Sequence, residues 1–267
     1  MTRVVGTELL ELAVRVAREA GELVQTMRAV GVDVAGTKSS DIDIVTKADK
    51  ACEDLIRTRL LDARPGDGFV GEEGSNLVGT SGVSWVVDPI DGTVNYLFGI
   101  PQYAVSIGVA VDEEMVAGVV LNPASGEEYS ASLGGGATLA GKPIRVRADV
   151  PLSQSLVGTG FNYVTEVRVR QGESVARMLP HVRDIRRMGS CALDLCAVAS
   201  GRLDAYVEEG VNPWDHAAGG LIAQESGARI EVTDGASGQS LMICATDAGF
   251  GRFRTLVAAS GFLAAGA

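Results

Sequence analysis

The chain has 267 residues, 46% of them hydrophobic, which is enough for one large domain or two small ones with a real core. Its formal net charge of −11 argues against nucleic acid as a ligand, because a phosphate backbone would be repelled. No apolar stretch reaches the roughly 18 residues that a membrane helix needs, and the N-terminus lacks the apolar core of a signal peptide. We therefore expect a cytoplasmic protein without a membrane span.

Several kinds of catalytic site are excluded by residue type. The four cysteines show no Cys-x-x-Cys spacing and are expected to be reduced and mostly buried. With His181 and His216 as the only histidines, a zinc site built from several imidazoles is ruled out. The sequence contains neither a Gly-x-Ser-x-Gly elbow nor a Walker A motif, so neither a hydrolase nucleophile turn nor a P-loop is expected.

The first part of the chain predicts helices separated by short polar segments. In order, the patterns indicate a long amphipathic helix at 7–29, a mobile loop or hairpin at 31–40, a short strand within 41–49, a helix at 50–63 and a short strand at 69–74. Either Thr46 or Asp49 is suited to cap the second helix. The strand at 69–74 ends in Glu72 and Glu73, which in isolation would be read as solvated acids.

The stretch from Trp85 to Pro101 is the one around which the chain is organised. Its apolar, β-prone start predicts a buried strand with Asp88 at its end, because Pro89 cannot continue a ladder. Asp91 then opens a turn, and a helix is expected to begin near Thr93 with free N–H groups at its start. Two acids beside a helix start suit divalent cations and a phosphate. The alternative is that both acids only cap the turn.

The remainder predicts an α/β fold. A β-meander is expected at 103–132, followed by a glycine turn at 134–136 and a strand at 142–146. In the second half, strands are expected near 155–160, 183–187, 203–207, 229–233 and 241–245, and helices at 166–179, 191–200, 214–226 and 251–264. Strands that alternate with helices indicate a partly parallel sheet. We expect an N-terminal half at 1–147 and a C-terminal half at 148–267 within one compact unit.

Acidic residues stand at several of the predicted strand ends and helix starts. They are Asp49, Glu72, Asp88, Asp91, Glu208 and Asp215. Strand ends on one side of a sheet can converge although they are distant in sequence. Carboxylates without histidine or thiolate favour Mg²⁺ or Mn²⁺ over zinc, and two such ions about 3.5–4 Å apart would clamp a phosphate and activate water.

Four short motifs carry a resemblance to a known family. They are Asp43-Ile-Val-Thr-Lys-Ala-Asp49, Gly71-Glu-Glu73, Asp88-Pro-Ile-Asp-Gly-Thr93 preceded by Trp85, and Trp214-Asp215-x-Ala-Ala-Gly219. In their order and spacing the chain resembles the inositol monophosphatase family, of the bacterial type, over nearly its whole length. The resemblance implies a layered αβαβα sandwich, usually a homodimer, with magnesium-dependent and lithium-sensitive phosphatase activity.

The resemblance also implies a set of metal ligands. Glu72, Asp88 and the carbonyl of Ile90 match the ligands of a first Mg²⁺, and Asp88, Asp91 and Asp215 match those of a second. Glu72 also matches the group that reaches a third, weaker ion through water, so two or three ions are expected. Manganese is a possible substitute.

Further site residues follow from the same resemblance. Asp49 and Thr93 match the pair that orients and deprotonates the attacking water, and the N–H groups of Gly92 and Thr93 lie where the family binds phosphate. The other implied contacts are Gly189, Ser190 and Cys191 on the sugar side, Glu208 at the inositol hydroxyls and Lys38 in a mobile loop over the metals.

These matches predict hydrolysis of inositol 1-phosphate by a metal-activated water, without a covalent phospho-enzyme. The metal motifs specify the reaction more firmly than the substrate, because related phosphatases of histidinol phosphate, fructose 1,6-bisphosphate and 3′-phosphoadenosine 5′-phosphate share them. Glu208 favours a polyol, although a strand-end acid without function would look the same. A protein of a different class, a non-catalytic interaction protein on this scaffold, is the remaining alternative.

Overall fold

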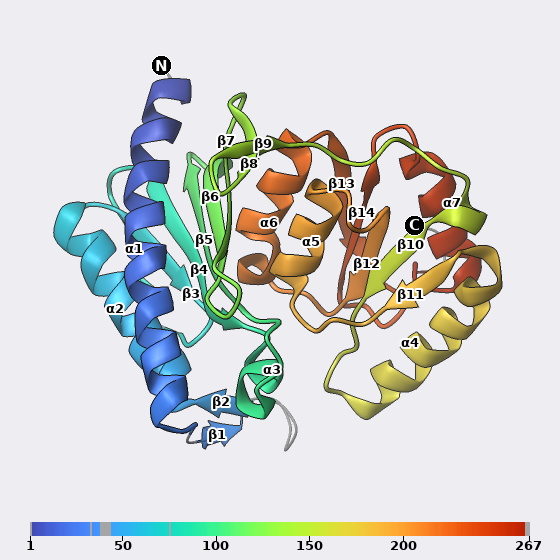
Figure 1. Cartoon of the computed structure of the whole chain (residues 1–267), viewed down its shortest axis with the longest axis horizontal. Coiled ribbons are helices and arrows are strands. Elements are labelled where there is room, and N and C mark those ends of the chain that lie inside the picture. The colour runs from blue at the N-terminus through green and yellow to red at the C-terminus, as the bar shows by residue number, and fades with distance from the viewer. Residues whose placement is uncertain (1, 33, 38–43, 75, 265–267) are drawn as a thin grey trace.

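The computed structural model describes residues 2–32, 34–37, 44–74 and 76–264. Helices and sheets alternate across the molecule in five layers, beginning with α1 and α2 and ending with α4 and α7 (Figure 1). The predicted αβαβα sandwich is confirmed. The described helices are α1 (Thr2–Val30), α2 (Lys47–Ala63), α3 (Thr93–Phe98), α4 (Thr165–Met178), α5 (Cys191–Ala199), α6 (Pro213–Glu225) and α7 (Phe250–Ser260). None of them is long and apolar enough to cross a lipid bilayer.

The larger sheet is a meander with one parallel edge strand. Within the described ranges its order is β3 (Gly68–Gly71), β4 (Val83–Asp91), β5 (Ala104–Val111), β6 (Glu114–Asn122), β7 (Glu127–Ser132), β8 (Gly136–Leu139) and β9 (Lys142–Ile144). Only β3 and β4 pair in parallel here, with Gly71 opposite Val87. Their C-terminal ends therefore lie at the same edge of the sheet, which brings the residues that follow them together.

The smaller sheet is mixed. Its described order is β11 (Asp184–Arg186), β10 (Leu156–Thr159), β12 (Ala205–Glu209), β14 (Ser240–Thr246) and β13 (Ala228–Asp234). The strand β10 is parallel to both neighbours, whereas β14 runs antiparallel to β12 and β13. The predicted partly parallel layer is thus confirmed. A separate hairpin pairs β1 (Val34–Thr37) with β2 (Ile44–Thr46).

The apolar stripe of α1 covers one face of the larger sheet. Leu9, Ala13, Val16, Ala20 and Val24 follow at three- or four-residue spacing and are each at most 2% exposed. That spacing places them on one side of the helix, against the core that also contains the inward residues of β4, β5 and β6. Burial of each leucine or valine among them contributes roughly 1.5–3 kcal/mol to folding, and burial of an alanine methyl contributes less.

The opposite face of this sheet allows α6 to approach very closely. Gly108 of β5 pairs with Gly118 of β6, and both lie under Ala218 of α6. A Cβ on Gly118 would sit 2.9 Å from the Ala218 Cα, so a larger residue there would push the helix away. This contact sets how far the start of α6, with Asp215, stands from the end of β4.

The strand that carries the first two acids runs further than the sequence predicts. Pairing of β4 with β5 continues to Asp91 instead of ending at Asp88. Asp88 pairs with Ser106 and Asp91 with Ala104, so the register slips by one residue across Pro89. Such a bulge lets the chain pass a proline without ending the strand, and bulges commonly lie next to active sites.

Other element boundaries also differ from the predictions. The helix expected at 251–264 ends at Ser260, because Gly261 adopts a left-handed cap with a φ of 89°. The glycine turn at 134–136 leads directly into β8, which the sequence pattern did not reveal. Glu208 lies within β12 rather than after it. The helix α2 begins at Lys47, since Thr46 caps it.

The two sequence halves share a core. Helices α5 and α6 come from the second half, yet Ala192 and Leu221 pack with Ala104 and Val120 of the first. The chain passes from one sheet to the other between the end of β9 and the start of β10. A boundary between 147 and 148 stays a prediction.

Candidate functional site

A pocket of about 640 Å³ lies where β3 and β4 end, where α3 and α6 begin and where β12 passes. Most of the residues predicted for the site line it. They are Glu72, Asp88, Ile90, Asp91, Gly92, Thr93, Gly189, Cys191, Glu208 and Asp215. The structure therefore brings together side chains that are separated by more than a hundred positions in the sequence.

The parallel pairing of β3 with β4 places Glu72 beside Asp88. The Glu72 N–H donates to the carbonyl of Val87 at 3.2 Å, so each acid directly follows a paired residue. Asp88 is 2% exposed, and its Oδ1 accepts the N–H of Ile90 at 3.0 Å within the bulge. That bond fixes the carboxylate at the pocket floor.

Asp91 joins the larger sheet to the start of α5. Its Oδ2 accepts the Ser190 hydroxyl at 2.6 Å and the Ala192 N–H at 2.7 Å. Ser190 also caps α5, where its oxygen accepts the N–H of Leu193. Asp91 is thus held at a helix start, which favours a negative charge.

Asp215 approaches the same place from α6. Asn212 caps this helix, and Asp215 at its third position accepts the Asn212 N–H at 2.6 Å in a capping box. One oxygen of the carboxylate thereby serves the cap. The other side of Asp215 faces the pocket, which it lines with Trp214.

The pKa values of these acids are raised because the acids are buried together. Burial, followed by the charges of Glu72, Asp91 and Asp215, raises the pKa of Asp88 well above its usual range. Burial, Asp91 and Glu72 raise the pKa of Asp215 in the same direction. For Asp91, burial raises the pKa to about 6 although the bonds from Ser190 and Ala192 oppose the shift. A proton or a cation between the carboxylates would relieve this repulsion.

Asp49 lies behind the pocket wall with a hydroxyl on each of its oxygens. Its Oδ1 accepts the Thr93 hydroxyl at 3.0 Å, and its Oδ2 accepts the Thr46 hydroxyl at 2.5 Å. The Thr46 N–H also donates to Oδ2, which completes the capping box of α2. Asp49 is fully buried, and only Thr93 of this group reaches the pocket lining.

The turn before α3 requires glycine. Gly92 has a φ of 94°, in the left-handed region, and a Cβ there would lie 2.9 Å from the Gln102 carbonyl oxygen. Both the backbone conformation and the space therefore exclude a side chain. Because α3 is only six residues long, its dipole is small, and an anion here would be bound mainly by the N–H groups of the turn.

The far side of the pocket carries a fifth carboxylate. Glu208 of β12 accepts the hydroxyl of Tyr206 at 2.5 Å, since residues two apart in a strand share a face. Burial raises the Glu208 pKa, whereas the Tyr206 bond and the charge of Arg187 lower it. Cys191 lines the same wall, where burial raises its thiol pKa well above the usual range.

The sequence matches the inositol monophosphatase family over residues 6–262. The inositol-1-monophosphatase SuhB of Mycobacterium tuberculosis is 46% identical over 260 residues, which cover 90% of each chain.

The chain belongs to the inositol monophosphatase family.

A solved structure and one further relative extend the comparison. The solved structure of Mycobacterium tuberculosis SuhB superposes with a TM-score of 0.84 at 42% identity, covering 96% of this chain and 98% of that one. A protein of Pseudomonas aeruginosa named Nus factor SuhB is 38% identical over 238 residues, covering 83% of this chain and 84% of its own. Proteins of the family are generally metal-dependent, so the donor set has to be tested against a divalent ion.

The side chains that line the pocket of this chain fit Mg²⁺ by their chemistry. The pocket offers four close carboxylates, and its single thiol is kept protonated by its raised pKa. As placed, no group of three His, Cys, Asp or Glu side chains in the described part of the chain has the geometry of a finished metal site. The side chains of Glu72, Asp88, Asp91 and Asp215 would have to rotate within the pocket to direct their oxygens onto shared ions.

Some predicted residues lie outside the pocket lining. Asp49 and Ser190 are buried behind it and reach it through Thr93 and Asp91. The side chain of Ser190 is 2% exposed, which favours a positioning role over direct contact with substrate. Lys38 and Asp43 fall outside the described residues, and the role of Lys38 stays a prediction.

Sequence reasoning missed several residues of the pocket and its surroundings, and Arg187 and Asn95 are two of them. Arg187 is the only cation among the described residues that line the pocket. Asn95 donates its amide to the carbonyls of Gln102 and Met188, both at 2.7 Å, and so ties the 189–191 segment to α3. The pair Arg186-Arg187 just before Gly189 was a visible signal, whereas a single Asn in a short helix gave none.

Proposed function

We propose that this protein is a Mg²⁺-dependent phosphomonoesterase that hydrolyses inositol 1-phosphate to inositol and phosphate. One observation carries the proposal: acids from β4, from α6 and from the residue that follows β3 meet in one pocket, beside a glycine turn with free N–H groups. In this proposal, Glu72, Asp88, the Ile90 carbonyl, Asp91 and Asp215 hold two Mg²⁺ ions. Bound there, Mg²⁺ would neutralise the phosphate dianion and lower the pKa of a bound water.

Asp49 and Thr93 are proposed to activate the attacking water. The Thr93 hydroxyl bonds to a buried carboxylate whose other oxygen is already occupied by Thr46. The same hydroxyl also lies 3.1 Å from the Ile90 carbonyl. When it donates to Asp49, its oxygen lone pairs can accept a proton from a water while its own proton passes to Asp49. Glu72, which also lines the pocket, is the third residue proposed to take part in catalysis.

The substrate side supports a polyol. The Glu208 carboxylate is an acceptor for sugar hydroxyls, and its Tyr206 bond fixes its direction. The N–H groups of Gly92 and Thr93 are proposed to hold the phosphate, with Gly189 and Cys191 lining the ring. Histidinol phosphate remains the second candidate, since its amine would pair with the same acid.

Arg187 is proposed to bind the anionic substrate at the entrance to this pocket. Its charge lowers the pKa of Glu208, and no described residue forms an ion pair with it. We expect Arg187→Gln to raise the KM for inositol 1-phosphate about 10-fold or more, because a charged hydrogen bond contributes about 1.5–3 kcal/mol. Steady-state kinetics would measure this change. Arg183→Gln, at an exposed site outside the lining, should leave KM unchanged, and equal effects from both would contradict the role.

The decisive experiment is phosphate release from a panel of substrates, with Mg²⁺ and with chelator. The panel contains inositol 1-phosphate, fructose 1,6-bisphosphate, 3′-phosphoadenosine 5′-phosphate and histidinol phosphate. Chelator-sensitive release that is fastest for inositol 1-phosphate supports the whole proposal. Faster phosphate release from another substrate of the panel would make that compound the assigned substrate and leave the mechanism unchanged. Inhibition by lithium and activity with Mn²⁺ would be measured in the same assay.

No release from any substrate would favour the non-catalytic alternative. One relative is named Nus factor SuhB, so a role other than phosphatase is a real alternative in this family. The retained carboxylates argue for catalysis, because a scaffold protein needs no set of mutually repelling buried acids. We place the reaction in the cytoplasm, which agrees with four free, buried cysteines.

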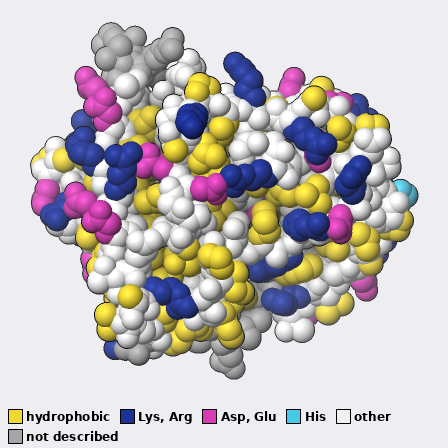
Figure 2. All heavy atoms as spheres, in the orientation of Figure 1, with side chains coloured by type: hydrophobic (Ala, Val, Ile, Leu, Met, Phe, Trp, Pro, Cys, Tyr) yellow, Lys and Arg dark blue, Asp and Glu magenta, His cyan; other side chains and the backbone are white. Residues whose placement is uncertain are grey.

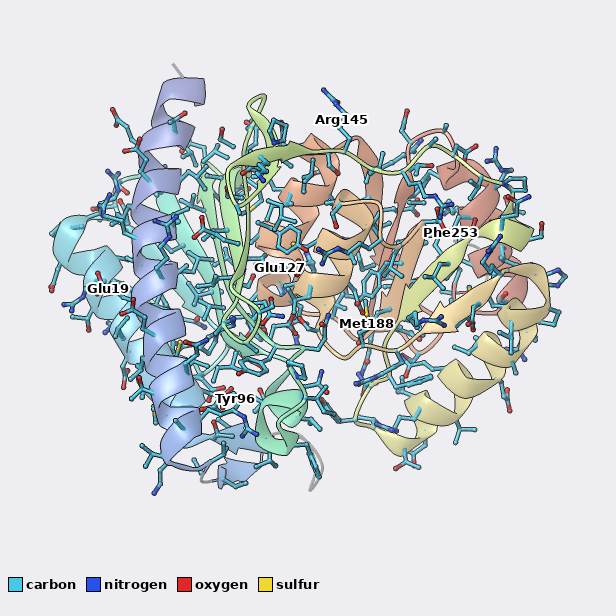
Figure 3. The ribbon with its side chains drawn as sticks, viewed as in Figure 1. Glu19, Tyr96, Glu127, Arg145, Met188 and Phe253 are labelled. Carbon is cyan, nitrogen blue, oxygen red and sulfur yellow. The ribbon has the colours of Figure 1, made fainter. Side chains whose placement is uncertain are left out.

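We further propose that the protein is a homodimer. The face in Figure 2 exposes apolar side chains among lysine and arginine side chains. The chain also has a hollow of about 190 Å³. Leu156 and Met188 line the hollow. Arg202 and Glu127 also line it, and Arg202 donates to the Glu127 carboxylate at 2.8 Å. Figure 3 labels Glu127 and Met188. Light scattering should give twice the monomer mass of 27.7 kDa. A monomer mass at micromolar concentration would contradict this.

A further inference from the structure

One face of α2 reaches the backbone of the segments that carry the candidate metal ligands. Cys52 and Glu53 follow Asp49 by three and four positions, so all three share a side of the helix. Cys52 and Asp49 are 0% exposed and Glu53 is 1% exposed. Cys52 is also part of the hydrophobic core. Apolar packing does not explain the polar contacts, because Cys52 and Glu53 each direct a polar group at a backbone atom next to a candidate ligand.

Glu53 holds the turn that carries Glu72. Its Oε2 accepts the N–H of Glu73 at 2.8 Å. The carboxylate lies directly on Gly71, where an added Cβ would come within 2.4 Å of Oε2 and 2.8 Å of Oε1. Gly71 is therefore small because Glu53 occupies the space. The backbone on both sides of Glu72 is thus in contact with a single buried carboxylate.

Cys52 holds the bulge that carries Asp88. Its thiol donates to the carbonyl of Pro89 at 3.3 Å. Pro89 has no N–H, so its carbonyl is the only backbone group with which this residue can be fixed. The neighbouring residues Asp88 and Ile90 are the proposed ligands of the first ion. The thiol bond is weak by itself, but it acts at the point where the register of β4 slips.

We propose that Cys52 and Glu53 are positioning residues that fix the two ligand-bearing segments, at Asp88–Ile90 and at Glu72, so that Mg²⁺ binds without rearrangement of the backbone. The inference rests on the proposed function. Helix α2 is suited to the task because Thr46 caps its start and Ile56 and Leu60 bury its next turns in the core. Groups that hold metal ligands in place commonly change metal affinity 10- to 100-fold when they are removed.

The test compares Mg²⁺ binding by calorimetry, without substrate, across matched variants of the full chain. We expect Glu53→Ala to weaken binding about 10- to 100-fold, whereas Glu53→Gln, which keeps an acceptor oxygen, stays near the wild type. Cys52→Ala should weaken binding less, and Cys52→Ser, which keeps a donor, should restore it. The Mg²⁺ concentration that gives half-maximal hydrolysis should shift in parallel, with kcat at saturating Mg²⁺ changed little.

Asp67 provides a structural control at the opposite end of the same strands. It is 1% exposed and accepts the Trp85 indole N–H at 3.0 Å and the Ser81 hydroxyl at 2.7 Å. Asp67→Ala should lower the melting temperature and leave Mg²⁺ affinity unchanged. The inference is overturned if Glu53→Ala binds Mg²⁺ like the wild type, or if Asp67→Ala weakens binding equally.

Hydrogen exchange in chelator separates this inference from the proposed function. Loss of Glu53 should speed exchange of the 71–74 amides even if the wild type hydrolyses none of the phosphates, because the Glu73 N–H loses its acceptor. Unchanged exchange over 71–74 overturns the positioning role, whatever the activity. A wild type that shows no Mg²⁺-dependent hydrolysis, with faster exchange in Glu53→Ala, would instead overturn the proposed function alone.

Discussion

Replacing Asp91 with Asn should abolish turnover and, in chelator, make the protein more stable. The loss of a ligand to the second ion removes several kcal/mol of transition-state stabilisation, which corresponds to a fall in kcat of about 10²–10³-fold or more. The gain in stability follows from burial, which raises the Asp91 pKa to about 6. An unfolded Asp has a pKa of about 3.9, so the ionised side chain weakens the fold at neutral pH.

The sign of the pH dependence is specific. Because the folded pKa is the higher one, the stability associated with protonated Asp91 is fully present below about pH 4 and is lost as the pH rises to about 6. At pH 7.5 the penalty is roughly 2–3 kcal/mol, or about 4–12 °C in melting temperature. An amide oxygen can still accept the bonds from Ser190 and Ala192, so Asp91→Asn removes the charge and keeps these contacts.

Thermal melts in chelator at pH 4 and pH 7.5, together with Mg²⁺-dependent activity, would check this prediction. The two proteins should melt alike at pH 4, and the variant should melt higher at pH 7.5. Asp62→Asn, at an exposed position of α2, is the matched control and should change neither quantity. Full activity in Asp91→Asn would show that the second-ion assignment is wrong, and an unchanged melt at pH 7.5 would show that Asp91 ionises freely.

Replacing Thr93 with Val should remove most of the rate and leave Mg²⁺ binding intact. The Thr93 hydroxyl donates to Asp49 Oδ1 and is the only part of this pair in the pocket lining. Proton transfer through a positioned side chain contributes about 10²–10⁴-fold, so we expect kcat to fall by that factor. Thr93→Ser keeps the hydroxyl and should retain most of the activity. Steady-state kinetics at saturating Mg²⁺ would measure both.

Thr46 provides the matched control, since its hydroxyl donates to the other oxygen of the same carboxylate. Thr46→Val removes the cap of α2, which costs about 1 kcal/mol of stability and about 2–4 °C in melting temperature. Its activity should fall far less than that of Thr93→Val. Equal losses of rate in the two variants would mean that Asp49 needs hydrogen bonds in general, and would contradict a specific role of Thr93 in water activation.

Local features of the sequence predicted most of the elements. The apolar spacing of α1, the capping residues Thr46 and Ser190, and the turn at Gly92 depend on residues within a few positions of one another. For the same reason the β-meander and the start of α3 were predicted correctly. Boundaries were missed where a distant partner decides them, as at Pro89, where pairing with β5 carries the strand through a bulge.

By itself, the sequence determined which acids are candidates for the site and to which family the chain belongs, because contiguous motifs carry that information. Only the tertiary structure decided what those acids contact. In the folded chain, Ser190 donates a hydrogen bond to Asp91, Arg187 lines the pocket and the Glu53 carboxylate packs against Gly71. These contacts depend on the order of strands in two sheets and on how closely the helices pack against them. A short stretch of sequence does not specify the strand order or the helix packing, since the contacts that result join residues about 20 to 100 positions apart.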